Sequence, residues 1–343
     1  MKIGITMGLV TLAYSGGVNV QCRMWHDGLQ SLGHDVYLLN EWDKFDFRSF
    51  DYIIIVGFGR SFIDYVRILS NYENIKLICA PIIDPNETSL MKFKIKSHFY
   101  GSVRRGLSQP LHDLYVCRNN FAFFLARSEF EKHYIVEGLG VSESKVKIAP
   151  LPMRFTETPT FDLGEKEDVC LHVSRLACAT KNVSRLIKAA KKYSFHLKLA
   201  GTLKGSDERN WLDKQIQGCS NIEYIGWLDE KDLINEYRKA KVFALPSTNE
   251  GVGMVALEAA AYGCEICLTG IGGPKEYYNG RAVLVNPYDV DDIGKGIIEA
   301  MNNKRAQPEL SNYLLKHYSM EGCMKQLERF LIDELTENTI ENK

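Results

Sequence analysis

Residues 242–258 read VFALPSTNEGVGMVALE, and this stretch decides which fold the chain is expected to adopt. The apolar run over 242–246 predicts a buried strand, and Gly251 and Gly253 predict a tight loop after it. Apolar residues then dominate 252–262, which predicts a helix. A strand, a glycine-rich loop and a helix in this order form the repeating unit of α/β proteins.

The same unit recurs along the chain. Continuous apolar runs such as residues 51–57 (DYIIIVG) are typical of parallel strands that are covered on both faces. Further strands are predicted over residues 2–7, 35–40, 76–80, 121–127 and 146–149, and then over 169–174, 196–200, 222–224, 265–268 and 283–285. Helices are predicted over 18–32, 181–192, 206–218, 230–239, 290–302, 309–317 and 321–335. This alternation predicts doubly wound α/β architecture in both halves.

The chain has 343 residues, a length that suits two domains. Residues 150–167 contain three prolines and no periodic apolar pattern, so we expect them to connect the domains. We place the first domain over residues 1–152 and the second over 165–318. Ligands of open α/β sheets bind beyond the carboxyl ends of the strands, so a cleft between two such sheets is the expected site.

Composition excludes several classes of protein. The net charge of −1 gives no overall attraction to nucleic acid, and no recognition motif for nucleic acid is present. No run of 18 apolar residues predicts a spanning helix, and the glycine-interrupted start predicts a strand rather than a signal peptide. The nine cysteines are scattered and odd in number, which favours buried thiols in the reducing cytoplasm over disulfides.

Charged residues follow the predicted strands of the second half. Arg175 follows one strand and Lys181 begins the next helix, and two such cations suit a diphosphate. Glu250 and Glu258 stand eight positions apart, or about 12 Å along a helix, which is comparable to the reach from sugar to ribose in a nucleotide-sugar. The alternative interpretation is that all four are solvated surface charges.

These residues belong to a collinear series that resembles the donor half of a retaining GT-B glycosyltransferase of glycosyltransferase family 4. The series covers roughly residues 168–300. Its members are Ser174-Arg175-Leu176, Lys181-Asn182, Leu199-Ala200-Gly201, Tyr224-Ile225-Gly226-Trp227-Leu228, Ala244-Leu245-Pro246-Ser247, Glu250-Gly251-Val252-Gly253, Glu258-Ala259, Gly272-Gly273-Pro274-Lys275-Glu276 and Asn286-Pro287.

The resemblance implies a GT-B fold, in which two Rossmann-like doubly wound domains face each other across a cleft. Residues 1–152 would form the acceptor-side domain and residues 165–318 the nucleotide-sugar domain. The resemblance also implies that a final helix over 319–336 packs back on the first domain. No cofactor or metal is implied, since the nucleotide-diphosphate sugar is a co-substrate and cations with helix dipoles can stabilise the leaving group.

The resemblance also assigns roles. Arg175 and Lys181 would neutralise the donor diphosphate, Glu250 would bind the donor sugar and Glu258 the ribose. The base would lie by Gly201 and the backbone around Trp227, and backbone amides near the phosphates would come from Gly251, Val252, Gly253 and Met254. This chain has one residue more between Arg175 and Lys181 than is usual in the family, and Met254 stands where many members have a smaller or β-branched residue.

In the first half, Gly16-Gly17 lies between a predicted strand and helix, and it resembles the family's glycine-rich loop facing the donor. A plain tight turn is the alternative. Relatives present a histidine or aspartate after the fourth strand; here Asp84 is the best candidate, although an Asp before Pro also simply starts a turn. His98 and His112 have less support.

Residues 91–105 (MKFKIKSHFYGSVRR) carry five Lys or Arg among apolar and aromatic residues, and no acid occurs from Thr88 to His112. One interpretation is a solvated basic loop. The other is a patch that contacts an anionic membrane, or a phosphate-bearing lipid-linked acceptor, at the inner face of the membrane.

The resulting hypothesis is a retaining, metal-independent glycosyltransferase that uses a nucleotide-diphosphate sugar in cell-surface glycan or glycolipid biosynthesis. A non-catalytic nucleotide-sugar-binding protein or partner subunit, and a sugar-nucleotide epimerase, stay open as alternatives. Residues 57–62 lack the third glycine of a dinucleotide fingerprint, which argues against a dehydrogenase. The acids at 289–292 predict a helix cap rather than a metal site.

Overall fold

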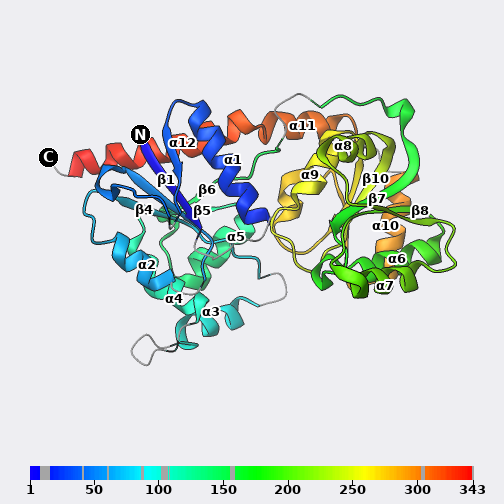
Figure 1. Cartoon of the computed structure of the whole chain (residues 1–343), viewed down its shortest axis with the longest axis horizontal. Helices are drawn as coiled ribbons and strands as arrows, with labels where there is room; N and C mark the ends of the chain where they lie inside the picture. Colours follow the sequence, from blue (N-terminus) through cyan, green and yellow to red (C-terminus); the bar gives the residue numbers. More distant parts are fainter. Residues whose placement is uncertain are drawn as a thin grey trace. The chain divides into compact units, whose positions relative to one another are not determined.

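The structure is a computed structural model that describes residues 1–7, 16–40, 42–59, 62–85, 89–101, 107, 109–154, 159–302 and 306–341 (Figure 1). The chain divides into two units, each with its own sheet. The first unit comprises Met1–Arg154 and Tyr318–Lys343, and the second comprises Phe155–His317.

The first unit is built on a six-stranded parallel sheet with the order β2-β1-β3-β4-β5-β6. Its strands are β1 (Lys2–Met7), β2 (Asp35–Leu38), β3 (Tyr52–Val56), β4 (Lys76–Ala80), β5 (Phe123–Ala126) and β6 (Val146–Ile148). Its helices include α1 (Gly17–Ser31), α2 (Phe62–Leu69), α3 (Leu90–Phe99), α4 (Pro110–Cys117), α5 (Glu129–His133) with a π-helical turn (Tyr134–Gly138), and α12 (Met320–Glu341). Strand β3 is fully buried, as its continuous apolar run predicts.

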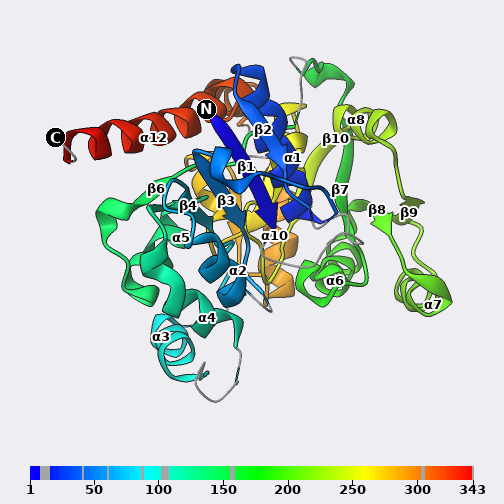
Figure 2. The same cartoon turned by 60° about the vertical axis from the view of Figure 1, so that its left-hand side comes forward.

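Helix α12 packs against this unit although it ends the sequence (Figures 1 and 2). A Cβ on Gly28 of α1 would lie 2.3 Å from Cγ of Met324, so glycine permits the close approach of α1 and α12. The carboxylate of Glu328 lies 2.7 Å from Nε2 of His34, and the hydroxyl of Tyr52 donates to the carbonyl of Leu331 at 2.7 Å. These contacts join the last helix to helix α1, to the turn before β2 and to the first residue of β3.

The second unit repeats the architecture with the strand order β12-β11-β10-β7-β8-β9, again parallel throughout. Its strands are β7 (Glu167–Arg175), β8 (His196–Thr202), β9 (Ile222–Gly226), β10 (Ala240–Leu245), β11 (Glu265–Thr269) and β12 (Val283–Val285). Its helices are α6 (Val183–Tyr193), α7 (Gly205–Ile216), α8 (Glu230–Lys239), α9 (Met254–Ala261), α10 (Val290–Asn302) and α11 (Glu309–His317).

Both sheets have a topological switch point, where consecutive crossovers leave in opposite directions. It lies between β1 and β3 in the first sheet and between β7 and β10 in the second. Loops that leave neighbouring strands in opposite directions open a crevice beyond the carboxyl ends, where ligands of such sheets bind. The expected doubly wound α/β organisation is therefore present in both units.

Two local expectations were wrong. Residues 90–99 form helix α3 rather than a loop, because Ser89 caps the N–H of Lys92 and Phe93 is buried against the rest of the unit. Helix α9 begins at Met254 rather than 252, because Gly253 takes a left-handed conformation with φ of 73°. Glu250 therefore precedes the helix, and the eight residues from Glu250 to Glu258 are not one helical run.

Within the described ranges, no helix is long and apolar enough to cross a membrane.

Candidate functional site

The switch point of the second sheet gathers three of the predicted site residues. Arg175 ends β7 and Lys181 lies in the loop that follows, whereas Glu250 lies in the loop after the neighbouring strand β10. Parallel strands place these loops at the same edge of the sheet. The topology thus brings together charged residues that are 75 positions apart in the sequence, from Arg175 to Glu250.

Hydrogen bonds tie these two loops to each other. The side-chain amide of Asn182 donates to the carbonyls of Pro246 at 2.8 Å and Pro287 at 2.6 Å. The backbone N–H of Thr248 donates to the carbonyl of Thr180 at 2.9 Å. Asn182 itself takes a left-handed conformation, which asparagine tolerates better than most residues. Because Asn182 follows Lys181, these contacts fix the backbone from which the lysine extends.

Lys181 and Glu250 form an ion pair at the end of these loops. The ammonium of Lys181 donates to Oε2 of Glu250 at 2.7 Å, and the hydroxyl of Ser247 donates to the same oxygen at 3.2 Å. The side chains are 27% and 13% exposed, respectively. The pair is therefore partly desolvated, which strengthens it, yet the more exposed partner is the cation.

The start of α9 offers backbone N–H groups beside this pair. Val252 is buried, and no side chain caps the helix at Gly253. A Cβ on Gly253 would lie 3.0 Å from Cδ2 of Leu245 and 3.6 Å from Cγ of Glu250. Glycine is therefore favoured both by the left-handed backbone and by the close approach of Leu245. An uncapped N-terminus with no acid in its first turn favours a bound anion at Met254 and the preceding Gly251 loop.

A thiol lies between the two predicted diphosphate ligands. Burial raises the pKa of the Cys178 thiol, but hydrogen bonds with Thr180 and the guanidinium of Arg175 outweigh this effect and lower it. The sulfur lies 3.2 Å from Oγ1 of Thr180. Arg175 itself is exposed at the edge of the sheet. The electrostatic environment of this loop therefore stabilises negative charge.

His172 was not among the predicted residues, because a histidine within an apolar strand gives no signal of its own. It is fully buried in β7, where Nδ1 lies 2.8 Å from the carbonyl of Ala244 and Nε2 lies 2.8 Å from the hydroxyl of Ser174. Since a carbonyl only accepts, Nδ1 carries the proton and Nε2 accepts from Ser174. Burial lowers the pKa of His172 to about 4. The neutral ring thus fixes Ser174, next to Arg175.

The remaining predicted residues of this unit differ in burial and in their contacts. Gly201 is required by packing, because a Cβ there would lie 1.7 Å from the carbonyl oxygen of Ser174. Trp227 follows β9 and is 67% exposed. Glu258 is 1% exposed in α9, and its carboxylate accepts the hydroxyl of Tyr237 at 3.3 Å. The predicted roles at the base and the ribose stay predictions, and the burial of Glu258 also suits a structural role.

In the first unit, Gly16 and Gly17 stand at the N-terminus of α1, where Gly16 is the N-cap and no side chain caps the helix. Residues 8–15, the rest of this predicted loop, lie outside the described residues. The loop follows β1, which borders the switch point of the first sheet. Its position suits an anion-binding helix N-terminus, and its predicted role toward the donor stays a prediction.

Asp84 lies in the turn after β4 and pairs with a buried arginine. Nη2 of Arg127 donates to Oδ1 of Asp84 at 2.5 Å, and Nε of Arg127 donates to Oε2 of Glu131 at 2.8 Å. Burial alone would lower the pKa of the guanidinium, but the two carboxylates outweigh it and raise that pKa. Neither Arg127 nor Glu131 was predicted; a partial signal was the Ser-x-x-Glu capping pattern at 128–131.

The two alternative histidines serve packing between helices. Nδ1 of His98 lies 2.9 Å from the carbonyl of Lys94, and Nδ1 of His112 lies 2.8 Å from the carbonyl of Ser97. These contacts hold α3 to itself and to α4.

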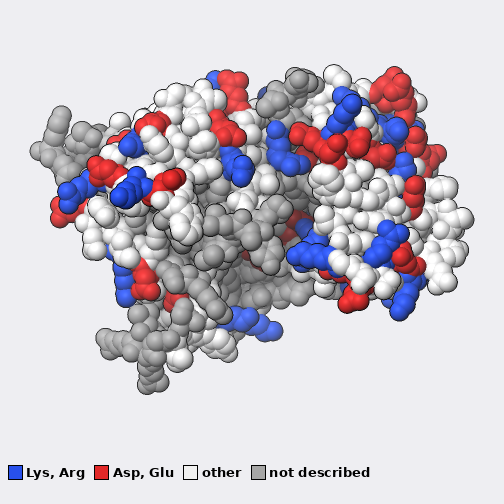
Figure 3. Space-filling model, viewed as in Figure 1, with Lys and Arg blue, Asp and Glu red and all other residues white. Residues whose placement is uncertain are grey.

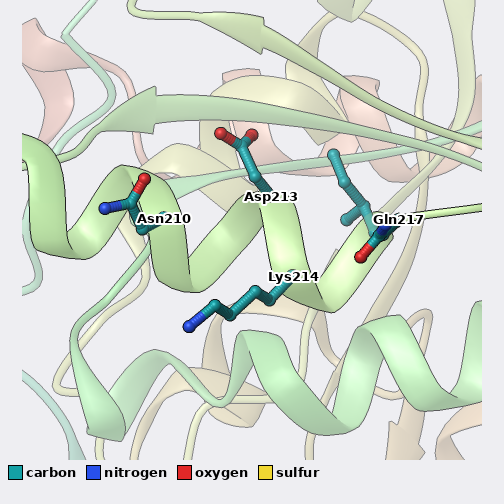
Figure 4. A pocket seen from close by; sticks show the side chains of 5 residues that line it. Asn210, Asp213, Lys214 and Gln217 are labelled. Carbon is teal, nitrogen blue, oxygen red and sulfur yellow. The ribbon is translucent and has the colours of Figure 1, made fainter.

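A shallow hollow on α7 is lined by Asn210, Asp213, Lys214 and Ile216 of that helix and by Gln217 at its C-terminus, and it contains none of the predicted residues (Figure 4). Cations and anions intermingle on the face of the second unit that Figure 3 shows. In the described ranges, no three His, Cys, Asp or Glu side chains come together as a possible metal site.

Residues 154–317 match the family of glycosyl transferases group 1. An uncharacterized glycosyltransferase of Methanocaldococcus jannaschii is 30% identical over 170 residues, which cover 46% of each chain. The O-antigen biosynthesis glycosyltransferase WbnH of Escherichia coli is 27% identical over 169 residues, or 49% of this chain and 47% of WbnH. The aligned part therefore spans about half the length of these curated relatives.

Anabaena HepE, whose structure holds UDP and glucose, is similar over 97% of this chain and 100% of its own, with a TM-score of 0.72 and 13% identity. At this identity the similarity concerns the fold. The expected GT-B fold class is thereby confirmed for the chain.

Proposed function

We propose that the whole protein is a retaining glycosyltransferase, because residues 154–317 match the group 1 glycosyl transferases. It moves a sugar from a nucleotide-diphosphate sugar to a hydroxyl acceptor in the assembly of a cell-surface glycan or glycolipid. The observation that carries the proposal is the ion pair of Lys181 and Glu250 at the switch point of the second sheet, where Lys181 lies in the loop that follows Arg175.

The pair suits a donor in which negative charge and hydroxyl groups are adjacent. Lys181 and Arg175 meet the diphosphate, together with the backbone N–H groups at the start of α9. Glu250 accepts hydrogen bonds from sugar hydroxyls. WbnH acts in O-antigen biosynthesis and HepE was solved with UDP and glucose, so UDP-sugars are the first donors to test.

The reaction breaks the bond between the anomeric carbon and the diphosphate oxygen and forms one from that carbon to the acceptor oxygen. The acceptor hydroxyl attacks from the side of the leaving group, and its proton passes to a phosphate oxygen of that group. Arg175 and Lys181 stabilise the negative charge that develops on the diphosphate, which takes the place of a metal ion.

The test is release of nucleoside diphosphate from a panel of UDP-glucose, UDP-galactose, UDP-N-acetylglucosamine and GDP-mannose. The wild type should release diphosphate from one of them, and Lys181→Ala should reduce the rate about 100-fold or more, because a charge-stabilising donor is lost. Lys188→Ala, an exposed lysine of α6, is the matched control. No release by the wild type in the presence of cell-extracted glycan and lipid acceptors would contradict the proposal.

A non-catalytic nucleotide-sugar-binding protein is the alternative, and the same panel separates the two. A thermal-shift response to a nucleotide-sugar without any release of diphosphate would favour it. Addition of EDTA to an active sample checks the expected independence from metal ions.

We also propose that α3 brings the protein to an anionic membrane at the cytoplasmic face, where a lipid-linked acceptor would lie. Met91, Ile95 and Phe99 recur every four residues and are 73%, 38% and 78% exposed. The other face of the helix buries Phe93, whose ring lies 5.2 Å from that of Tyr134. One stripe of α3 is thus anchored in the unit, and another presents apolar side chains outward.

Lysines flank the outward stripe. Lys92, Lys94 and Lys96 are exposed, and Lys94 lies 3.7 Å from the half-exposed Glu137, a contact that water weakens. Each lysine near an anionic surface contributes about 1 kcal/mol of binding. All nine cysteines are free thiols, which suits the reducing side of a membrane.

Flotation with phosphatidylglycerol-containing vesicles tests this surface. Phe99→Ser should lower binding at all salt concentrations, and replacement of Lys92 and Lys96 by Gln should lower it mainly at low salt. Leu284→Ser is the control, because Leu284 is an apolar residue, 46% exposed, on edge strand β12 of the second unit. Equal binding by the α3 variants and the control would contradict the assignment.

A further inference from the structure

The turn after β4 has a strained backbone. Ile82 takes a φ of 57°, a left-handed conformation that β-branched residues avoid. The next residue, Ile83, is buried, and its N–H donates to Oε1 of Glu131 at 2.6 Å. Strain of this kind persists only where surrounding contacts impose it, and it concentrates at functional sites. The N–H that follows the strained residue is held by a carboxylate from another element, helix α5.

The carboxylate of Glu131 does not make the hydrogen bond that is usual at its position in a helix. It is the third residue of α5, and its N–H donates to the hydroxyl of the cap, Ser128, at 3.1 Å. In a capping box, a glutamate at this position turns back to the N–H of the cap. Here its two oxygens accept four hydrogen bonds, from the N–H of Ile83 and from the backbone N–H, Nε and Nη2 of Arg127.

Arg127 extends this arrangement to Asp84. Its Nη2 donates to Oδ1 of Asp84 as well as to Glu131. The side chains are 2% exposed for Glu131, 9% for Arg127 and 29% for Asp84. A chain of charged hydrogen bonds therefore runs from the interior of the unit to a partly exposed carboxylate at the carboxyl edge of the first sheet. Burial of the charges of Glu131 and Arg127 costs desolvation free energy. A turn can be closed without that cost, so the arrangement favours a functional role for the turn.

We propose that Glu131 and Arg127 are positioning residues, which hold the 81–85 turn so that Asp84 presents its carboxylate to the hydroxyl groups of a bound sugar. The proposal rests on the proposed function, which supplies the sugar. A carboxylate that faces a guanidinium accepts hydrogen bonds, and sugar hydroxyls donate them. Asp84 is then a binding group for hydroxyls, and its orientation depends on two residues that never touch the substrate.

The test measures release of nucleoside diphosphate from the donor that the wild type uses. Asp84→Asn and Glu131→Gln should each lower kcat about 100-fold, since a misplaced group costs about that factor. The double variant should lose no more than Asp84→Asn alone, because Glu131 acts through Asp84. Glu129→Gln, an exposed neighbour in α5, is the control and should match the wild type.

Two results would overturn the proposal: a Glu131→Gln variant with wild-type kcat, or a double variant whose loss is the product of the two single losses. If the wild type released no nucleoside diphosphate from any donor, that result would contradict the proposed function and not the positioning role. In that event hydrogen exchange decides: the amide of Ile83 should exchange faster in Glu131→Gln than in Glu129→Gln, and equal rates would refute the positioning role.

A second variant covers the possibility that Glu131→Gln does not fold. Ile82→Gly removes the strain, because glycine adopts the left-handed region freely, and it leaves both buried charges paired. The turn then has more conformations available. Lower kcat in a folded Ile82→Gly protein is the expected result, and an unchanged kcat would show that the geometry of the turn does not matter.

Discussion

The two sheets present opposite charges at their carboxyl edges. In the second unit the lysine of the Lys181–Glu250 pair is the more exposed partner, at 27% against 13%. In the first unit the acid of the Asp84–Arg127 pair is the more exposed partner, at 29% against 9%. The same kind of ion pair therefore offers a cation on one sheet and an anion on the other, which suits a diphosphate and sugar hydroxyls, respectively.

Reversal of the pair in the second unit is expected to have the largest effect. The double variant Lys181→Glu with Glu250→Lys keeps an ion pair, so its melting temperature should stay near that of the wild type. Its kcat should nevertheless fall about 1,000-fold, because the diphosphate meets an anion in place of a cation. A rate of diphosphate release within tenfold of the wild type would contradict the claim that the second sheet offers a cation to the diphosphate.

The stability of the two pairs should also differ. Arg127→Met leaves two carboxylates without their buried partner and should lower the free energy of unfolding by about 3–5 kcal/mol. Lys181→Met removes a partly exposed partner and should cost about 1 kcal/mol or less. Urea unfolding followed separately for the two units measures both changes. Equal decreases in the free energy of unfolding would contradict the expectation that the more buried ion pair contributes more to stability.

The second unit should lose stability in acid through His172. Its pKa is lowered by burial to about 4, below the ordinary value of 6.5, so the unfolded chain binds the proton more readily. The buried neutral ring therefore costs the second unit no stability above pH 6.5. As the pH falls toward 4, the free energy of unfolding decreases by at most about 3 kcal/mol. Unfolding of wild type and His172→Gln over this range measures it, and parallel curves would contradict the burial of a neutral ring.

The smallest effect concerns Cys178. Its lowered thiol pKa and partial exposure should make it react with iodoacetamide faster than the buried thiols of Cys170 and Cys267, whose pKa values burial raises. Saturation with the donor should slow the reaction, because Cys178 lies between Arg175 and Lys181. Cys219, also partly exposed but on another loop, is the control, and mass spectrometry locates the label. Protection of Cys219 alone would argue against a donor beside Cys178.

Much of the fold could be predicted because both sheets are parallel and buried on both faces. Such strands are continuous apolar runs, and β4 and β12 were placed at their observed limits. The boundary of α9 was missed because it depends on a single left-handed glycine, Gly253. Helix α3 was missed because its outward face is apolar, so no amphipathic period was visible over 90–99.

The site was predicted unevenly for a similar reason. Lys181 and Glu250 carry charge in short polar segments, so the sequence marks them, although only the strand order brings them together. Arg127 and His172 lie next to or in apolar strands, and Glu131 is buried in a short helix. Their contacts reach partners 43 to 72 positions away, such as Asp84 and Ala244. Side-chain type alone does not distinguish such residues from ordinary members of the interior.

The most direct test of the central claim is the affinity of the protein for a nucleoside diphosphate relative to its nucleoside, measured by calorimetry with UDP and uridine, and with GDP and guanosine. The wild type should prefer one diphosphate over its nucleoside by about 100-fold, or about 2.7 kcal/mol. In the reversed pair, Lys181→Glu with Glu250→Lys, that preference should vanish while nucleoside affinity is unchanged. A reversed pair that keeps the full preference would contradict the assignment of the diphosphate to this edge.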